Sequence, residues 1–299
     1  MRFFQRRKHA TAATWEQRLP AAALVYRDED GRRRRGDAPY LLPKDEKEVG
    51  RLDYQHFVLR QVLKGNSYAP VHRLLLKGGP VLDVGCGTGR WGCEVATDYP
   101  QTQVIGFDLE DVPRSTIPPA NYHFVQGNVL HGLPFADHTF TYVHQRLLVA
   151  GLPLDIWPWE MEELKRVTCP GGWVELIEMG NTFHHAGPAT TQFLNWWAAI
   201  SASRGIDATK MAEIGLFLQR AGFSHIHTTT KRIPVGRWGG RIGHLLAQNI
   251  LAGWPSIRPL AHTQLGVLPD VFDEVIGRLE AEWNSAHTSY DVYFACGQV

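Results

Sequence analysis

Residues 80–89 read Pro-Val-Leu-Asp-Val-Gly-Cys-Gly-Thr-Gly, and this stretch decides the fold. The run 81–84 is apolar except for one Asp and has glycines on both sides, which predicts a short strand buried on both faces. Such a strand is typical of a parallel sheet covered by helices. Three alternate glycines then allow a tight turn in which the backbone approaches a ligand closely: Gly85, Gly87 and Gly89. A helix that follows would present free N–H groups to an anion or carboxylate.

Several ligand-binding loops combine a strand with glycines, and their spacing separates them. The dinucleotide fingerprint G-x-G-x-x-G/A would place Arg90 at its last position, where only a small residue allows close helix–strand packing. A P-loop would need Lys followed by Ser or Thr, which this turn lacks. A turn without a ligand is the remaining alternative, and it is disfavoured because three clustered glycines cost backbone entropy.

A second apolar run, 104–109, carries a carboxylate at its next-to-last position, 19 positions after Gly89. This residue, Asp108, is placed to accept hydrogen bonds from a ribose at the carboxyl end of a strand. It does not distinguish NAD from other adenosine-containing cofactors, and a solvated Asp at a strand end is the less favoured alternative.

The pattern D-x-G-x-G-x-G resembles the first motif of class I S-adenosylmethionine (SAM) methyltransferases. Three later stretches resemble further motifs of that family: 122–129, 133–144 and 170–178. Two positions depart from the family pattern, since Asn128 and Thr141 stand where Asp is usual. An Asn carbonyl still accepts a hydrogen bond from an adenine amino group, so adenine recognition is weakened as an inference without being removed.

The resemblance implies an α/β fold of the Rossmann-like class I methyltransferase type. We therefore expect a three-layer sandwich with a mostly parallel seven-stranded sheet, an antiparallel last strand near 290–296 and a helical lid. It also implies SAM as the cofactor, held by Asp83, Gly85, Cys86, Gly87, Gly89, Asp108, Leu109, Asn128, Val129, His144 and Gln145. In that family the glycine loop holds the amino-acid part of SAM, Asp108 would bind the ribose, and Asn128 and Val129 the adenine.

The segment 40–56 is similar to one that precedes the SAM domain in relatives of the fungal secondary-metabolism regulator LaeA. The similarity to this branch extends over roughly residues 38–180. It implies methyl transfer to a small, lipophilic acceptor of natural-product type, on O, N or C. A SAM-binding regulatory subunit without a substrate cavity is the alternative from another class. An NAD-dependent oxidoreductase is disfavoured by Arg90.

The domain organisation follows from the position of these motifs. Residues 1–70 are expected to form an N-terminal helical cap, and 71–299 the SAM-binding domain with lid insertions at about 181–207 and 235–289. Helices are expected over 193–203 and 208–221. Aromatic residues in these segments suggest a substrate pocket, although ordinary packing is the plainer interpretation for any one of them: Tyr26, Tyr40, Trp157, Trp196 and Trp197.

A general base is needed only where the acceptor must lose a proton. His144 and Glu178 lie at the ends of two predicted strands, so we expect their side chains nearest the transferred methyl group. His144 is the candidate base because an ordinary imidazole titrates near neutrality.

Composition bounds the remaining possibilities. The chain has 299 residues, 44% of them hydrophobic and 20% charged, which suits one large α/β domain. No apolar run reaches the ~20 residues of a membrane helix, and no secretory signal follows the basic start, so a cytoplasmic location is expected. The four cysteines have no metal or disulfide spacing, and no metal site is expected.

Charge is concentrated at the N-terminus, where residues 1–35 have a balance of +6 against −5 for the rest. The run Arg32–Arg35 suggests either a nucleic-acid patch or a loop that pairs with its own acidic neighbours, and the second is favoured. We therefore expect a small-molecule partner and neither a nucleic acid nor a membrane. The N-terminal segment is also a candidate contact for a homo-oligomer.

Overall fold

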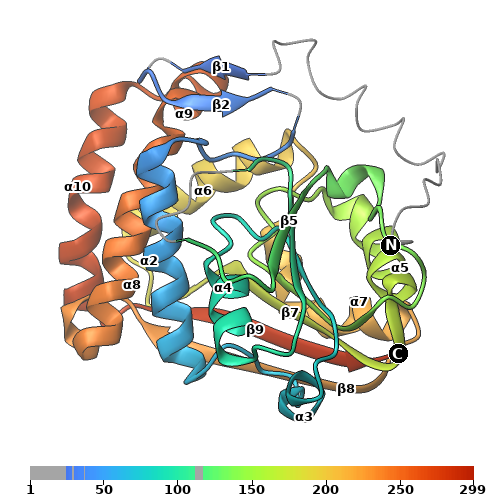
Figure 1. The fold of residues 1–299 in the computed structure, drawn as a ribbon. Coiled ribbons are helices and arrows are strands. Elements are labelled where there is room, and N and C mark those ends of the chain that lie inside the picture. Colours follow the sequence, from blue (N-terminus) through green and yellow to red (C-terminus); the bar gives the residue numbers. More distant parts are fainter. Residues whose placement is uncertain (1–24, 29, 37, 112–116) are drawn as a thin grey trace.

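The chain folds around one seven-stranded sheet, seen in the computed structural model, which describes residues 25–28, 30–36, 38–111 and 117–299 (Figure 1). The strand order is β5-β4-β3-β6-β7-β9-β8. Their bounds are β3 Val81–Val84, β4 Val104–Asp108, β5 Tyr122–Gln126, β6 Phe140–Arg146, β7 Thr168–His184, β8 Ser224–Pro234 and β9 Ser289–Gln298. β9 runs antiparallel to both of its neighbours, β7 and β8, and the other neighbouring pairs of the sheet are parallel. The expected Rossmann-like methyltransferase sheet is confirmed.

The first strand, β3, is buried along its whole length, as its apolar sequence predicts. Its side chains alternate between the two faces of the sheet. Leu82 and Val84 pack into a core beneath one face, while Val81 packs into a separate cluster on the other. That second cluster is covered by the helices α3 His72–Leu76 and α4 Arg90–Asp98. The strand is therefore held from both sides, and its end presents the glycine turn at a fixed place.

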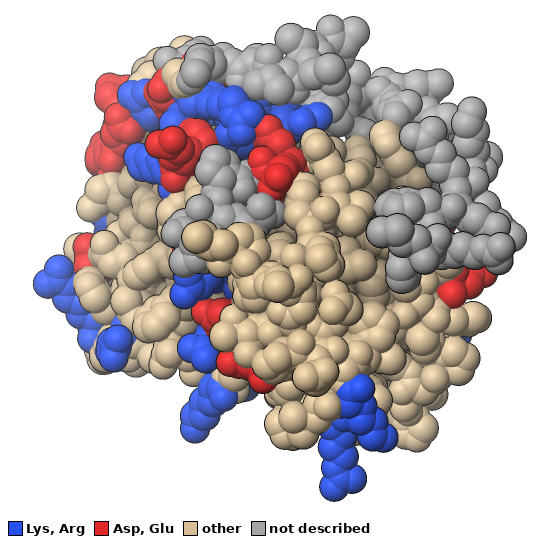
Figure 2. Space-filling view, in the orientation of Figure 1, with Lys and Arg blue, Asp and Glu red and all other residues tan. Residues whose placement is uncertain are grey.

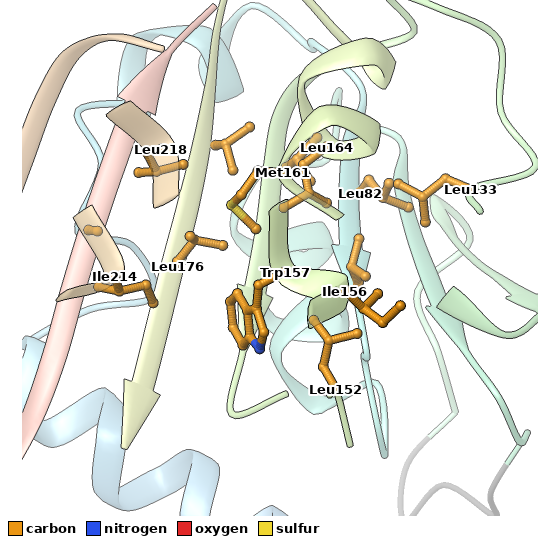
Figure 3. Close-up of a cluster of buried hydrophobic side chains, with 14 of the residues drawn as sticks. Leu82, Leu133, Leu152, Ile156, Trp157, Met161, Leu164, Leu176, Ile214 and Leu218 are labelled. Atoms are coloured by element: carbon orange, nitrogen blue, oxygen red, sulfur yellow. The ribbon is translucent and has the colours of Figure 1, made fainter. Parts of the chain in front are cut away.

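The opposite face is covered by α5 Trp157–Val167 and α7 Ile214–Arg220. Figure 3 shows side chains of α5, Met161 and Leu164 among them, meeting sheet residues such as Leu82 and Leu176. Trp157 belongs to this core, is 1% exposed and stacks on Phe217. The expectation that Trp157 lines a substrate pocket is therefore wrong, because it opens a helix whose apolar face lies under the sheet.

A second group of helices stands beside the sheet and packs into its own apolar cluster (Figure 1). It consists of α2 Glu46–Leu63, α6 Pro188–Ala202, α8 Gly240–Gly253, α9 Arg258–Leu265 and α10 Pro269–Ala286. The cluster also takes in sheet residues, for example Ile177 and Phe294. Segments from both ends of the chain thus meet here, and the N-terminal α2 packs on the C-terminal α8.

Two helix boundaries differ from those expected. α6 begins at Pro188, five residues before the expected start, because Pro fits the first turn of a helix and Glu282 caps the free N–H groups there. The segment expected as one helix over 208–221 divides into a 3-10 turn, Ala208–Glu213, followed by α7. Its apolar spacing alone did not reveal this change of helix type.

The arginine run falls on the strand β2 Arg33–Arg35, which pairs with β1 Val25–Arg27. Three of its members have acidic partners at 2.5–2.6 Å: Arg32 pairs with Asp45, Arg33 with Glu110 and Arg34 with Asp28. In Figure 2 basic and acidic side chains accordingly lie side by side over this hairpin. The expected pairing with acidic side chains is found, but the expected solvated loop is wrong: the run lies mostly in a strand, Arg34 is buried, and only Asp28 belongs to the acidic stretch directly before the run.

None of the helices in the described ranges combines the length and the apolar character needed to cross a membrane. Nor does that part of the chain bring together three or more His, Cys, Asp or Glu side chains in an arrangement able to hold a metal ion.

The cap on α6 yields a test of the lid. The Glu282 carboxylate accepts hydrogen bonds from Ala189 N and Thr190 N at 2.8 and 2.9 Å. Glu282→Ala would leave both donors unpaired, so we expect the free energy of unfolding to fall by about 1–3 kcal/mol in urea titrations. Glu282 lies in α10, and Glu274→Ala, at an exposed position of that helix, is the matched control. It should change the free energy of unfolding by less than ~0.5 kcal/mol. Equal effects of the two would contradict the capping role.

Candidate functional site

The glycine turn after β3 forms one wall of a large cavity at the carboxyl edge of the sheet. Gly85, Gly87 and Gly89 have φ of +67°, +55° and +73°, a region that side-chain-bearing residues rarely adopt. A Cβ atom on Gly87 would meet only Leu52, at 3.8 Å, and would otherwise enter open space. The backbone here is therefore bare toward the cavity. Gly89 starts α4 and does not line the cavity, so its expected ligand contact is not seen.

Asp108 ties the glycine turn to the end of β4. Its Oδ2 accepts a hydrogen bond from Gly87 N at 2.8 Å, and its Oδ1 lies 3.7 Å from Lys44 Nζ. The carboxylate also lines the cavity. Because an ionised carboxyl has about four acceptor positions, it keeps capacity to bind a diol.

Asn128 and Val129 line the cavity beyond β5. The Asn128 side chain accepts a hydrogen bond from Leu130 N at 3.0 Å and so starts a single 3-10 turn. Leu109 and Cys86 also border the cavity, between the glycine turn and this edge. The bare glycine backbone after β3, the carboxylate at the end of β4 and the amide after β5 therefore follow one another along three neighbouring strand ends.

The N-terminal helix α2 closes the cavity from the other side. Thr88 Oγ1 in the glycine turn donates to Asp53 at 2.6 Å, and His56 Nε2 lies 3.1 Å from Glu94 in α4. Residues of α2 and of the stretch just before it line the cavity, all within the segment 40–56: Tyr40, Leu42, Lys44, Arg51, Leu52, Gln55 and His56. The sequence resemblance singled out this segment but did not assign a site role to any of these residues except Tyr40. Positions 48, 51, 52, 55 and 56 share one face of a helix, which was the available signal.

Arg146, the last residue of β6, is a cavity residue that the sequence analysis missed. Its guanidinium donates to His56 Nδ1 at 3.1 Å. Burial and the nearby Arg146 charge lower the pKa of His56 to about 4. The imidazole is therefore neutral near pH 7, so it is able to accept this hydrogen bond.

His144 does not lie as a general base should. It is 1% exposed, its Nδ1 lies 2.8 Å from Asp83 Oδ1, and its ring stacks on Trp91 with 3.8 Å between ring centres. His144 and Asp83 occupy paired positions of β6 and β3, so both side chains point to the α4 face, beneath the glycine turn. The expectation that His144 points at the acceptor is corrected here, although an edge of both residues borders the cavity.

Glu178 and Gln145 were also expected at the site, and neither lines the cavity. Glu178 is completely buried and accepts hydrogen bonds from Leu148 N at 2.8 Å and Val149 N at 3.3 Å. Burial raises the pKa of Glu178 to about 8. Glu178 therefore holds the loop after β6 from within the protein, instead of facing an acceptor.

The far end of the cavity is lined by aromatic and amide side chains of the lid region. Phe183 stacks on Tyr290 at 4.2 Å, and Trp254 closes the same wall. Asn181 and Met179 lie between this wall and the sheet edge.

Four more aromatic side chains were expected at the substrate pocket. Of these, Tyr40 and Trp197 line the cavity. Trp196 does not, because it stacks on Phe272 of α10 at 5.5 Å. The side chain of Tyr26 lies outside the described residues.

These residues fit SAM chemically. The backbone without Cβ atoms at Gly87 leaves space for the methionine part of a sulfonium cofactor, and the strand-end carboxylate of Asp108 offers acceptors for a ribose diol. The fold and this edge of the sheet together define a class I methyltransferase.

Comparison with known proteins places the chain more closely. A family model described as "Methyltransferase domain" matches residues 54–228, more than half of the chain, so the protein belongs to this family. It is a SAM-dependent methyltransferase, and SAM is its cofactor.

The relatives include two methyltransferases and a regulator. Methyltransferase str2 of Strobilurus tenacellus is 34% identical over 46% of this chain, and the match spans about half (47%) of str2. Methyltransferase pytC of Aspergillus terreus is 29% identical over 91% of this chain and 88% of its own length. The secondary metabolism regulator LAE1 of Cochliobolus heterostrophus is 27% identical over 67% of both chains.

Among solved structures, a phosphoethanolamine N-methyltransferase 2 of Haemonchus contortus in complex with SAM aligns with a TM-score of 0.46 and 16% identity. The alignment covers 82% of this chain and 57% of that one.

The Asp108 position yields a binding test. Asp108→Ala removes the acceptor of Gly87 N and the carboxylate facing the cavity, and we expect S-adenosylhomocysteine to bind ~10–100-fold more weakly by isothermal titration. The matched control is Asp98→Ala, an exposed carboxylate at the end of α4, which should bind as wild type does. Unchanged affinity in Asp108→Ala would place the ribose elsewhere.

The raised pKa of Glu178 yields a test by pH. Between about pH 4.5 and 8 the folded protein keeps a proton on Glu178 that the unfolded chain has released, so stability falls as pH rises through this window. Glu178→Gln does not titrate. We expect the loss of unfolding free energy between pH 5 and pH 8 to be larger in wild type, by up to several kcal/mol. Parallel pH profiles for the two proteins would contradict the buried, protonated Glu178.

Proposed function

We propose that this protein transfers the methyl group of SAM to a small, largely apolar acceptor held between the sheet edge and the lid helices. One observation carries the proposal: a single cavity runs from the glycine turn to an aromatic wall formed by Phe183, Trp254 and Tyr290. A cofactor site alone would not need this second compartment. Its lining suits a ligand with flat or aliphatic surface, oriented by few polar groups.

The roles of the chain's residues follow from their places. The glycine turn would hold the amino-acid part of SAM, Asp108 the ribose, and Asn128 with Val129 the adenine edge. Bound SAM supplies a methyl group on a sulfonium with an activated leaving group. The protein's task is then to align the acceptor and exclude water, and the segments 38–63, 181–207 and 235–289 would act as the lid that does so.

The second compartment offers amide and phenol groups where a base would be expected. Asn181 and Asn249 do not titrate, and the Tyr290 hydroxyl donates to Gly180 O while burial raises its pKa. Among the described residues, none of these is suited to remove a proton near neutral pH. We therefore propose that the acceptor atom is nucleophilic without deprotonation by the protein, or that it loses its proton to solvent before the compartment closes.

A SAM-binding regulatory subunit is the second candidate, favoured by the likeness to LAE1. The two functions differ in the fate of the methyl group. Incubation with methyl-labelled SAM and a small-molecule extract of the producing organism separates them. A labelled small product supports the enzyme, and label found only as protein-bound SAM supports the regulator.

The lid compartment yields a further prediction. Trp197 lines the cavity, whereas Trp238 is 39% exposed and lies outside it. We expect Trp197→Ala to lower methyl transfer at least ~10-fold, because acceptor alignment is lost, with S-adenosylhomocysteine affinity within twofold of wild type. Trp238→Ala should preserve both. Equal transfer by the two variants would contradict an acceptor site beneath the lid.

A further inference from the structure

Arg146 carries a charge for which the described residues provide no counter-ion within 4 Å. It ends β6, one residue beyond the paired positions Val84 and Gln145, and thus lies beside the start of the glycine turn. Its printed hydrogen bond goes to the neutral imidazole of His56, at 3.1 Å. Within the described residues no carboxylate oxygen approaches its guanidinium to 4 Å.

The acidic groups around Arg146 are already engaged. Asp83 lies against His144, and Glu175 accepts hydrogen bonds from Tyr68 N and Ala69 N at 2.7 and 2.5 Å. Glu94 is surrounded by His56, Arg60 and Arg90, each at 3.1 Å. The Glu94 carboxylate is shared among these three side chains, and its oxygens lie more than 4 Å from the Arg146 guanidinium nitrogens.

Arg146 is partly buried, and a cation withdrawn from water without a nearby opposite charge is destabilising, since the lost hydration is not offset. The guanidinium stays charged in proteins, so the cost is not relieved by loss of a proton. Its position in the cavity wall allows a ligand to supply the missing anion. A planar guanidinium with unused N–H donors matches a carboxylate, which it binds through two parallel hydrogen bonds.

We propose that Arg146 binds a carboxylate in this cavity, namely the carboxylate of the methionine part of SAM, and that His56 is a positioning residue for it. The cofactor is favoured over the acceptor as the source because Arg146 adjoins Gly85, whereas the aromatic wall of the acceptor compartment comes from β7, β9 and the lid. The proposal rests on the proposed function only in taking SAM to occupy the glycine-turn end.

His56 would hold the guanidinium fork in place. Its Nδ1 accepts from Arg146 while its Nε2 faces Glu94 of α4, so the imidazole spans from the helix to the strand end. α2 is thereby connected to the Arg146 guanidinium through the His56 side chain. This gives a physical reason for a histidine on the inner face of α2.

The test compares two probes by isothermal titration with the full chain: S-adenosylhomocysteine and its decarboxylated analogue, which lacks only the carboxylate. Wild type should prefer S-adenosylhomocysteine by ~10–100-fold. Arg146→Met should bind S-adenosylhomocysteine that much more weakly and the analogue within twofold of wild type. Lys44→Met, at the ribose end, is the matched control and should weaken both probes equally.

Thermal unfolding guards against a misfolded variant. Because Arg146→Met removes a partly buried charge that has no carboxylate partner within 4 Å among the described residues, its ligand-free melting temperature should equal or exceed that of wild type, while the increase caused by S-adenosylhomocysteine should shrink. Arg146→Lys should keep part of the preference as a point charge.

The positioning role of His56 is tested by rescue. His56→Asn keeps an acceptor near the place of Nδ1 and should retain most of the preference for S-adenosylhomocysteine, whereas His56→Leu should lose much of it. Equal behaviour of the two would remove His56 from the proposal.

The carboxylate assignment itself is overturned if Arg146→Met weakens both probes alike, or neither. An unchanged preference accompanied by a raised KM for an acidic acceptor would also overturn it, by making the acceptor the source of the carboxylate. Both probes are read without methyl transfer, so the proposal on the acceptor and this one fail independently.

Discussion

The hydrogen bond from Gly87 N to the Asp108 carboxylate is the interaction on which the site depends. It joins the turn after β3 to the end of β4 and fixes the glycine backbone at positive φ values that residues with a side chain rarely adopt. A charge-assisted bond of this kind contributes about 1.5–3 kcal/mol. The same carboxylate faces the cavity, so one side chain both shapes the cradle and presents an acceptor to the ligand.

The second constraint comes from the N-terminal helix. α2 contacts the glycine turn through Asp53 and Thr88, and α4 through His56 and Glu94. Its inner face thus forms a wall of the cavity, and Arg51 extends it to Asn249 of α8. The SAM cavity and the lid compartment therefore share α2 as a boundary. A ligand bound in either compartment would therefore pack against α2.

The sequence predicted the strand ends well because their signals are local. A short apolar run followed by glycines or by Asp108 is readable without knowing the partner strands. Direction was harder to predict. His144 was expected at a strand end, but β6 continues to Arg146, and the face on which His144 lies follows from its pairing with Asp83 in β3, which places its ring against Trp91. Trp157 likewise belongs to an apolar helix face, and only the packed structure shows which surface that face meets.

The cavity is formed jointly by the sheet edge and α2. Hydrogen exchange with and without S-adenosylhomocysteine tests this most directly. We predict slower exchange in both the turn 85–90 and the inner-face amides of α2 over 51–57, because ligand binding stabilises contacts that the two elements share. Protection confined to the sheet edge, with α2 exchanging at its ligand-free rate, would contradict it.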